Sequence, residues 1–500
     1  MKMLYNVNDR PKTKEIAVFA FQQLLAILAA TIAVPTIVNS VTGANMDIAA
    51  ALFGAGVGTI VYLLFTKSKS PVFLGSSFAF LGPLFTAVSF GYCGVIVGSI
   101  FAGAVYIVIA IVVKFFGTQW IHKLMPPVVI GPTVALIGLS LAGSAMGDMA
   151  TATGASVYHG YNLIAILCGL VTFFVVIICS TQKRFKSMRL VPFILGIACG
   201  YVTAAIFSAF GYGFDVDYLK IINWKPLVEN FVKDGSFVGI TAFLNYPNLG
   251  IINAIKELAT GEVQTGVGQM LNGQGVASIA LAFIPVALVV FAEHIADHKN
   301  LGSIIEKELV EGNDPGLSRT LLGDGVGSIA GTIFGVCPNT TYGESVGCVA
   351  ITRNASVITI WTTAILALVV SFLSPVMAIL RTIPNCVMGG VCLSLYGFIA
   401  VSGLKMLKDI DLGENHNLFV VSAILIAGIG GLAINIPIAK AGLTPDGNGT
   451  GYIEIKNIAT ALILGIVVNV VLTAIEKIKA KNEPTDEAEA EADNAQQLIK

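Results

Sequence analysis

The sequence predicts an all-α membrane protein that crosses the bilayer many times. Apolar residues make up 55% of its 500 residues and charged residues only 12%, about half the ~25% that is usual in soluble domains. The mean hydropathy is +0.82. Such a chain has too few polar groups to cover a surface in water, which excludes a soluble enzyme and a nucleic-acid-binding protein. The formal net charge of −1 gives no overall attraction for anionic partners.

Apolar runs of bilayer length give the number of crossings. A spanning helix needs about 20 mostly apolar residues, and the clear candidates are 15–40, 47–66, 93–116, 126–146, 161–181, 189–212, 276–297, 355–378, 384–403, 417–437 and 455–476. Three further stretches are apolar but short or interrupted by Gly, namely 73–91, 319–336 and 338–353. We therefore expect about fourteen transmembrane segments. The first run is too long for the core of a signal peptide and is expected to remain as a helix.

Basic residues indicate the orientation of these segments. If residues 1–14 are cytoplasmic, every second turn should be basic. Those turns carry Lys67 and Lys69; Lys114 and Lys123; Lys183, Arg184, Lys186 and Arg189; Lys299, Lys307 and Arg319; Arg353; Lys405 and Lys408; and Lys477, Lys479 and Lys481. The opposite loops carry only Arg381, Lys440 and the mixed charges of 213–275. Fourteen segments with both termini in the cytoplasm, in the inner (cytoplasmic) membrane, fit this pattern.

Two regions lie outside the membrane in this scheme. The segment 213–275 is too long for a turn and is expected to be an extracellular loop with short amphipathic helices at 225–235 and 249–260. The end of the chain, 477–500, is acidic and Ala-rich and has no apolar face. We expect it to be a disordered cytoplasmic tail.

Broken segments at matching positions point to a transporter. The stretch 73–91 is third from the start of the chain, and 338–353 is third from the start of the second half. Such a pair is the best sequence indication of a transporter binding site. Because each half has seven segments, an odd number, the two halves must be inverted relative to one another.

Carboxylates within the apolar runs are the first candidate functional residues, because buried charge is costly. Glu293 and Asp297 are four residues apart and share one helix face. Glu293 follows an unbroken apolar run and is the deepest. The alternative is a helix end whose charges meet water. We adopt that alternative for His298, leave it open for Asp297 and disfavour it for Glu293.

A metal site is the second interpretation of this region. His294 and His298 have i,i+4 spacing, but the order His-Glu-x-x-His and a convincing third ligand are missing. The eight cysteines include no Cys-x-x-Cys pair, so no zinc site or disulfide framework is implied. An intramembrane metal-dependent enzyme is thus kept only as an alternative.

The run Gly335–Glu344 contains Pro, Asn, Thr and Gly inside an apolar stretch. Non-helical backbone is tolerated at this depth only where protein or a watery cavity satisfies it. Glu344 would then open a half-helix whose free N–H groups face a cavity. A kinked packing helix is the alternative.

The remaining candidates have open alternatives. In the run 73–83, Phe78 or Phe80 could stack on a planar ligand, or pack in the core. Asp324 lies at or near the start of its segment and could instead be an N-cap. The Gly-rich runs 54–58 and 323–327 follow no soluble strand, and helix packing explains them better than nucleotide binding. No Walker A motif occurs, so ATP is not expected to drive the protein.

These motifs resemble the nucleobase–ascorbate transporter family, and most closely its bacterial uracil permeases. The similarity rests on Gly75-Ser-Ser-Phe-Ala-Phe80, Ala292-Glu-His294, Pro338-Asn-Thr-Thr-Tyr-Gly-Glu344 and Pro384-Asn-Cys-Val-Met-Gly-Gly-Val391. It runs from about residue 8 to 480, and the third motif is the most specific.

The resemblance implies fourteen segments in two inverted repeats of seven, with segments 3 and 10 broken. A core domain would consist of segments 1–4 and 8–11, and a gate domain of segments 5–7 and 12–14. In residues, the core domain is 15–116 with 276–378, and the gate domain is 119–212 with 384–476.

The resemblance also implies roles for particular residues. Glu293 and Glu344 would hold the N–H and carbonyl groups of uracil, and Phe78 would stack on the ring. Tyr342 and Gly343 would line the site, with the backbone N–H of Gly343 donating to a carbonyl. Asp297 stands where the uracil permeases can carry a histidine linked to proton coupling.

Some positions depart from the family pattern. The signature has Asn after the key acidic or amide residue, where this chain has Ser345, and the common Gln-His of the first helix is Gln22-Gln23. Asp324 occupies a position where the purine permeases tend to carry Asp. Glu344, which is usually Gln in those permeases, favours a pyrimidine, so a xanthine or uric acid permease remains the alternative.

Together these features predict proton-coupled import of uracil by alternating access. A buried carboxylate binds protons more readily because desolvation disfavours its charged form. We assign proton coupling to Glu293, with Asp297 and Asp324 as further candidates. An anion channel or exchanger of similar architecture would need cations near the half-helices. No cofactor or metal is expected; uracil, a proton and the lipid bilayer are the expected partners, and a homodimer is left open.

Overall fold

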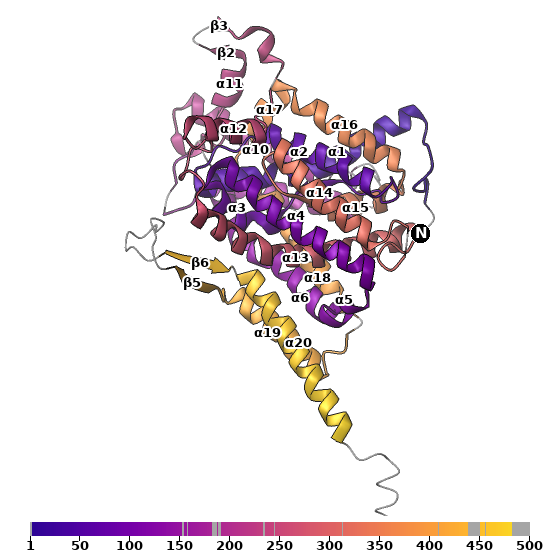
Figure 1. The fold of residues 1–500 in the computed structure, drawn as a ribbon. Helices are drawn as coiled ribbons and strands as arrows, with labels where there is room; N and C mark the ends of the chain where they lie inside the picture. The colour runs from indigo at the N-terminus through magenta and orange to yellow at the C-terminus, as the bar shows by residue number, and fades with distance from the viewer. Residues whose placement is uncertain are drawn as a thin grey trace, which may run out of the picture.

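The computed structural model describes residues 3–152, 155–157, 159–182, 188, 192–233, 236–244, 246–312, 314–408, 410–438, 451–455 and 457–482. The chain is predominantly helical, as Figure 1 shows. Within these residues, nine helices are long and apolar enough to cross a membrane. The expected helical membrane protein is therefore confirmed at this level.

The long helices follow the predicted segments closely. In the first half they are α1 (Thr13–Thr42), α2 (Ile48–Phe65), α4 (Gly91–Phe116), α6 (Pro127–Ser140) with α7 (Ala142–Ala150), α8 (Leu163–Thr181) and α10 (Pro192–Gly213), with the short α5 (Gln119–Leu124) before α6. In the second half they are α13 (Gly273–Ile305), α14 (Leu317–Phe334), α16 (Val357–Ser371), α17 (Ser374–Arg381), α18 (Asn385–Lys405), α19 (Asn415–Ile429) and α20 (Asn457–Asn482).

Two of these helices extend beyond their predicted ends. The helix α13 continues to Ile305, eight residues past the predicted limit of 297, so Asp297 and His298 lie within the helix. The helix α20 continues through Asn482, and the first six residues of the predicted tail are therefore helical. The rest of that tail, 483–500, lies outside the described residues.

The two interrupted segments form strands followed by short helices. In the first, β1 (Leu74–Ser76) leads into the single 3-10 turn η1 (Phe78–Phe80) and α3 (Leu81–Val88). In the second, β4 (Asn339–Thr341) leads into α15 (Gly343–Thr352). The two strands pair antiparallel, with Gly75 opposite Thr340. The prediction of an all-α chain did not include this pair, nor the smaller pairs β2 (Val232–Lys233) with β3 (Ser236–Phe237) and β5 (Ile434–Ile438) with β6 (Gly451–Ile455).

Several contacts between helices recur when each helix of the first half of the chain is exchanged with the helix at the same position in the second half. The helix α2 packs against α14, and α6 packs against α18. The contact of α4 with α14 has a counterpart in α16 with α2, and the contact of α8 with α10 has one in α19 with α20. Contacts of α13 with α4 and of α1 with α16 form a further matching pair.

Glycine lets α2 and α14 touch backbone to backbone. A Cβ atom on Gly54 would lie 2.2 Å from the carbonyl oxygen of Gly331, and one on Gly58 would lie 2.8 Å from that of Gly327. These distances are too short for any side chain, so small residues are required at the crossing. The Gly-rich runs 54–58 and 323–327 are thus packing motifs, as the sequence predicted.

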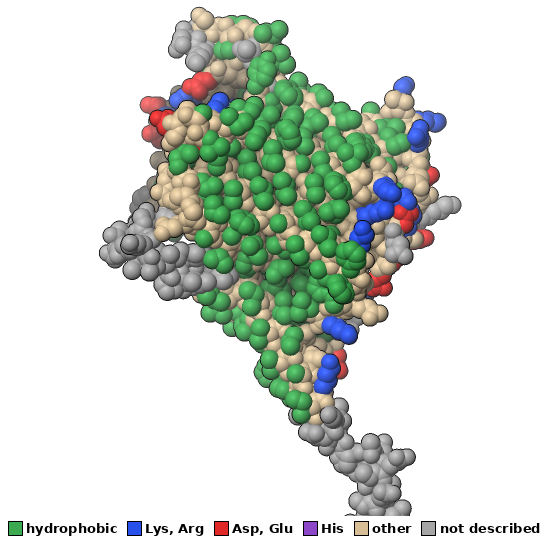
Figure 2. Space-filling view, in the orientation of Figure 1, with side chains coloured by type: hydrophobic (Ala, Val, Ile, Leu, Met, Phe, Trp, Pro, Cys, Tyr) green, Lys and Arg blue, Asp and Glu red, His purple; other side chains and the backbone are tan. Residues whose placement is uncertain are grey.

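The outer surface of the bundle is apolar (Figure 2), and Lys and Arg side chains appear mainly at its edges. Large apolar side chains on several helices are more than two fifths exposed, among them Val108, Phe174, Ile178, Val202, Ile365, Phe419, Ile426 and Val467. Such a surface matches the hydrocarbon core of a bilayer rather than water.

The segment between α10 and α13 packs onto the bundle. It contains η2 (Asp217–Leu219), α11 (Lys225–Phe231), η3 (Gly239–Ala242) and α12 (Gly250–Thr260). The two longer helices fall within the predicted amphipathic pieces. The helix α11 contacts α17, and α12 contacts α4 and α14.

Glu257 on α12 caps the start of the membrane helix α4. Its carboxylate accepts hydrogen bonds from the backbone N–H groups of Tyr92 (2.8 Å), Cys93 (3.0 Å) and Gln264 (3.0 Å). It is 1% exposed. First-turn N–H groups have no partner inside their own helix, so this carboxylate supplies one and ties the loop to the bundle.

We predict that Glu257→Ala destabilises the protein, because one buried and two partly buried N–H groups lose their carboxylate acceptor. The expected loss is about 2–3 kcal/mol, measured as a lower melting temperature of the purified protein in detergent. Glu262→Ala, which removes an exposed carboxylate of the same segment, is the control. Equal melting temperatures for the two variants would contradict the capping role.

Candidate functional site

The strand pair β1–β4 positions the candidate site inside the bundle. Its backbone groups pair across the register Leu74–Thr341, Gly75–Thr340 and Ser76–Asn339. The flanking backbone is also satisfied, since Ser77 N–H donates to the Pro338 carbonyl at 3.1 Å. Non-helical backbone at membrane depth is thus tolerated because each strand supplies partners for the other.

Tyr342 locks the two broken segments together at the start of α15. Its hydroxyl donates to the Ser76 carbonyl at 2.8 Å, and its backbone N–H donates to the Phe73 carbonyl at 3.2 Å. The ring lies close against Gly75, where an added Cβ would come within 2.3 Å of it. Gly75 is therefore needed for this contact, and Tyr342 holds the shape of the site.

Three carboxyl groups lie together beside this strand pair. Glu293 and Asp297 come from α13, and Glu344 comes from the first turn of α15, which packs against α13. A Cβ atom on Gly343, the residue before Glu344, would lie 3.5 Å from Asp297 Oδ1. Thr341 Oγ1 donates weakly to Asp297 Oδ2 at 3.4 Å. The packing of α15 against α13 thus brings Glu344 toward Glu293 and Asp297, three of the four acidic residues that the sequence singled out.

An open space borders these carboxyl groups. Gly343 is exposed although its neighbours Thr341 and Tyr342 are buried, and the nearest atom to an added Cβ would be Asp297 Oδ1 at 3.5 Å. One turn further along α15, nothing lies within 4 Å of a Cβ on Gly347. Partial exposure also continues along α13, through Glu293, Ala296 and Asp297 to the exposed Asn300.

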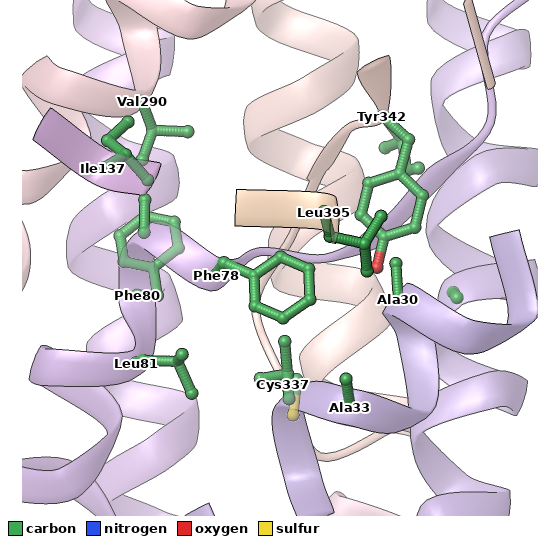
Figure 3. Close-up of a cluster of buried hydrophobic side chains, with 14 of the residues drawn as sticks. Ala30, Ala33, Phe78, Phe80, Leu81, Ile137, Val290, Cys337, Tyr342 and Leu395 are labelled. Carbon is green, nitrogen blue, oxygen red and sulfur yellow. The ribbon is translucent and has the colours of Figure 1, made fainter. Parts of the chain in front are cut away.

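The two phenylalanines of the first broken segment have different surroundings (Figure 3). Phe80 is 1% exposed and stacks on Phe283 of α13, with the ring centroids 5.4 Å apart. Phe78 is 6% exposed, and its ring lies between Phe80 and Tyr342, next to Leu395. Its edge-to-face neighbour is Tyr396 of α18, at 5.4 Å. Phe80 is therefore a packing residue, and Phe78 is the aromatic side chain placed between the strand pair and α18.

A polar contact that the sequence did not reveal joins α1 to α15. Gln23 Nε2 donates to Ser345 Oγ at 2.6 Å, and Phe73 N–H donates to the same oxygen at 3.0 Å. Both side chains are buried. These are two of the positions at which the sequence departs from the family pattern, so the departures meet in space. The fact that both positions depart from the family pattern in the same chain could have indicated that these two residues are in contact.

The two histidines of α13 are buried and fully hydrogen-bonded. His298 Nδ1 donates to the His294 carbonyl at 2.9 Å, and Nε2 is hydrogen-bonded to the Tyr62 hydroxyl at 2.8 Å, which also bonds Ser70 Oγ at 2.7 Å. His294 bonds Thr320 Oγ1 at 3.1 Å and Asp324 Oδ2 at 2.6 Å. The expectation that His298 meets water was wrong, because α13 continues past it. All four ring nitrogens are engaged, which leaves no free lone pair for a metal ion.

Asp324 lies inside α14 and not at its start. The helix begins at Leu317, two turns earlier, and the carboxyl group is 1% exposed. The N-cap alternative is therefore wrong. Its contact with His294 places Asp324 on a different face of α13 from Glu293 and Asp297, because residues 293 and 294 are about 100° apart around a helix.

Comparison with known proteins identifies relatives over the whole fold. A family model described as "Permease family" matches residues 14–436. The uracil permease of Bacillus subtilis (strain 168) is 34% identical over 98% of this chain and 98% of its own length. That of Bacillus caldolyticus is 33% identical over 94% and 95%, and that of Escherichia coli (strain K12) is 30% identical over 97% of both chains.

Solved structures share the fold at low sequence identity. The transmembrane domain of a cyanobacterium bicarbonate transporter, BicA, matches with a TM-score of 0.53 and 14% identity over 93% of this chain and 99% of its own. The murine anion transporter Slc26a9, in an inward-facing state, matches with a TM-score of 0.57 and 9% identity over 94% and 70%. These matches describe architecture alone.

We predict that Gln23 and Ser345 are energetically coupled. Gln23→His and Ser345→Asn, the residues usual in the family, should each lower uptake when made singly, because each breaks a buried hydrogen bond. The double variant should recover part of the loss, with a coupling of about 1 kcal/mol, or roughly fivefold in rate. Uptake by cells with matched expression measures it. If the loss of uptake in the double variant equals the product of the losses in the two single variants, the contact does not contribute to transport.

Proposed function

The chain belongs to the permease family of the nucleobase–ascorbate transporters, whose uracil permeases it resembles along its length, and from that membership we propose that it imports uracil across the cytoplasmic membrane. Membership in a permease family indicates a transporter rather than an enzyme. The observation that carries the choice of substrate is the presence of Glu293, Glu344 and the exposed Gly343 beside the open room between α13 and α15.

The chemistry of this space suits a neutral, flat, polar ring. Uracil offers two N–H donors and two carbonyl acceptors. The carboxyl groups of Glu293 and Glu344 can accept from its N–H groups, and the free N–H groups in the first turn of α15 can donate to a carbonyl. Phe78 supplies an aromatic face from the opposite broken segment. We propose that Tyr342 contributes by shaping the site, since its hydroxyl is already bonded to Ser76.

An anion substrate is the rival from the same fold, because BicA and Slc26a9 transport anions. Here the first turn of α15 carries Glu344, and the residues facing it from α13 are Glu293 and Asp297. The helix N-terminus attracts an anion, but ionised carboxyl groups at three neighbouring positions repel it more strongly. The site therefore favours a neutral substrate.

A purine permease of the same family is the nearer alternative. Asp324 was the residue that left a purine substrate possible. It is hydrogen-bonded to His294, which is on a different face of α13 from Glu293 and Asp297. Glu344 lies in the first turn of α15, next to the exposed Gly343, so we give it more weight and favour a pyrimidine. Competition of labelled uracil uptake by thymine, 5-fluorouracil, xanthine and uric acid separates the two; stronger competition by xanthine than by thymine would reverse the choice.

We propose that a proton moves with the substrate. Three neighbouring carboxyl groups repel one another when all are ionised, and a proton on one of them removes part of that repulsion. Glu293 is both a ligand and the proton carrier in this scheme. Asp297, one turn further along α13 and partly exposed, relays the proton, and Asp324 acts only indirectly through His294.

The matching helix contacts support two inverted repeats of seven segments. If α1–α10 and α13–α20 are equivalent halves, each helix pair in one half has a counterpart in the other, as α4–α14 has in α16–α2. We propose the corresponding domains: a core of segments 1–4 and 8–11 that carries the carboxyl groups, and a gate of segments 5–7 and 12–14 that carries Tyr396.

The direction of the opening supports alternating access. Partial exposure runs from Glu293 toward the end of α13, whereas Phe78 is closed off by Tyr396 and Leu395. The positive-inside rule places that end of α13 on the cytoplasmic side, with both termini. We therefore propose that the arrangement is inward-facing and that movement of the gate would open the other side.

We predict that Glu344→Gln weakens uracil transport and admits purines, because the amide turns one acceptor into a donor. A site built to hydrogen-bond its substrate can reject a mismatch by as much as ~10⁴-fold, so we expect the apparent KM for uracil to rise at least tenfold. The competition assay with xanthine measures the change in preference. Unchanged uracil affinity with the same competition profile would remove Glu344 from the site.

We predict that Phe78→Ala raises the KM for uracil but leaves proton coupling intact, since it removes only stacking area. Phe80→Ala is the matched comparison: it should instead lower the melting temperature, because loss of a buried aromatic ring costs about 3–5 kcal/mol. Normal transport by Phe78→Ala would make Phe78 a packing residue as well.

We predict that Glu293→Gln retains weak uracil binding but loses accumulation driven by a proton gradient, because an amide can hydrogen-bond yet cannot titrate. Asp297→Asn should show a milder loss. Uracil accumulation in proteoliposomes, with and without an imposed inward proton gradient, measures both. If Glu293→Gln still concentrates uracil in response to the gradient, Asp297 becomes the proton carrier.

A further inference from the structure

A second polar group of residues surrounds a small cavity between α4, α14 and β4. The cavity has a volume of about 10 Å³, which is the room that one water molecule needs. Its polar lining comes from Tyr106 on α4, Asp324 and Ser328 on α14, and Asn339 and Thr340 on β4. Glu293, Glu344 and Phe78 are not among the residues that line it, so it is separate from the proposed substrate site.

Four of these five side chains, all except Thr340, have an oxygen atom without a hydrogen-bond partner in the described part of the chain. The atoms are Tyr106 OH, Asp324 Oδ1, Ser328 Oγ and Asn339 Oδ1. The four residues are between 1% and 5% exposed. An unpaired polar atom in a protein interior is costly, and four of them around one cavity indicate a shared partner.

The hydrogen-bond roles of two of these atoms follow from their neighbours. Asn339 Nδ2 donates to the Gly54 carbonyl at 2.9 Å; since a carbonyl only accepts, Asn339 Oδ1 is the atom left over, and it is an acceptor. Asp324 Oδ2 is bonded to His294 Nδ1, which leaves Oδ1 as a second acceptor. The hydroxyls of Tyr106 and Ser328 are each able to donate.

The geometry points to one bound water molecule that joins these four side chains. A water donates two hydrogen bonds and accepts two, which is the complement of two acceptors and two hydroxyl donors. A sodium ion accepts lone pairs only, and would leave the two hydroxyl hydrogens without an acceptor. The water links α4, α14 and β4, and through Asp324 and His294 it fixes the part of α13 next to Glu293. Tyr106, Ser328 and Asn339 are therefore positioning residues.

Hydroxyl-radical labelling of the wild-type protein tests the water directly, because radicals formed from a bound water attack the side chains around it. Tyr106 should be oxidised several times faster than its low exposure allows. Tyr92, which is similarly buried but donates to the Asn45 carbonyl at 3.2 Å, is the matched control. Equal labelling of the two tyrosines would overturn the proposal.

A double-mutant cycle tests the link between helices. Tyr106→Phe and Ser328→Ala should each lower the melting temperature, by roughly 2–4 °C. The double variant should lose less than the sum, because both substitutions disturb the same water. Tyr396→Phe on α18 removes another buried hydroxyl without a described partner, and should be additive with Ser328→Ala. Additive losses for Tyr106→Phe with Ser328→Ala, or no loss in either, would contradict the shared water.

Replacement of sodium tests the rival ligand. The melting temperature should be the same in sodium, potassium and choline chloride at equal ionic strength, because water is present in all three. A rise specific to sodium that disappears in Asp324→Asn would assign the cavity to a cation and overturn the proposal.

Discussion

The pairing of β1 with β4 is the constraint on which the rest of the structure depends. Inside a membrane, backbone N–H and C=O groups must find partners within the protein, and two short strands from opposite halves of the chain provide them for each other. The pairing also fixes where α15 begins, at Gly343, the turn that we propose to face the substrate. It also explains the small residues nearby, since Gly75 admits the Tyr342 ring and the glycines of α2 and α14 bring those helices close enough to enclose the strands.

Around that frame, α13 separates two kinds of chemistry. One face presents Glu293 and Asp297 to the open space beside α15, where ligand and proton are proposed to bind. The adjacent face presents His294 and His298 to Asp324 and Tyr62, in a region where every ring nitrogen is hydrogen-bonded. A single helix thus carries titratable groups for the proposed substrate site on one face and hydrogen-bonded histidines on the other.

Much of this could be predicted from the sequence because the bilayer imposes simple rules on length and charge. The long spans follow from long apolar runs, the two broken segments follow from apolar runs that are short or interrupted by Gly, and the three carboxylates follow from acidic residues inside apolar runs. The strand pair, the partner of Tyr342 and the contact of Gln23 with Ser345 could not be predicted, since they join residues more than 250 positions apart. His298 was misjudged because α13 extends eight residues further than hydropathy indicates, and a helix end was expected where the helix continues. For Asp324 the sequence left an N-cap open, and the structure excludes it because α14 begins at Leu317.

The central claim is that a neutral pyrimidine occupies the space between α13 and α15. Counterflow measures this most directly: purified protein is reconstituted into liposomes loaded with unlabelled uracil, and entry of external labelled uracil is followed without any ion gradient. We expect transient accumulation of the label by the wild type and none by a variant in which Glu293 and Glu344 are both replaced by Ala. Counterflow that persists in this double variant, or exchange of bicarbonate or chloride in place of uracil, would contradict the account.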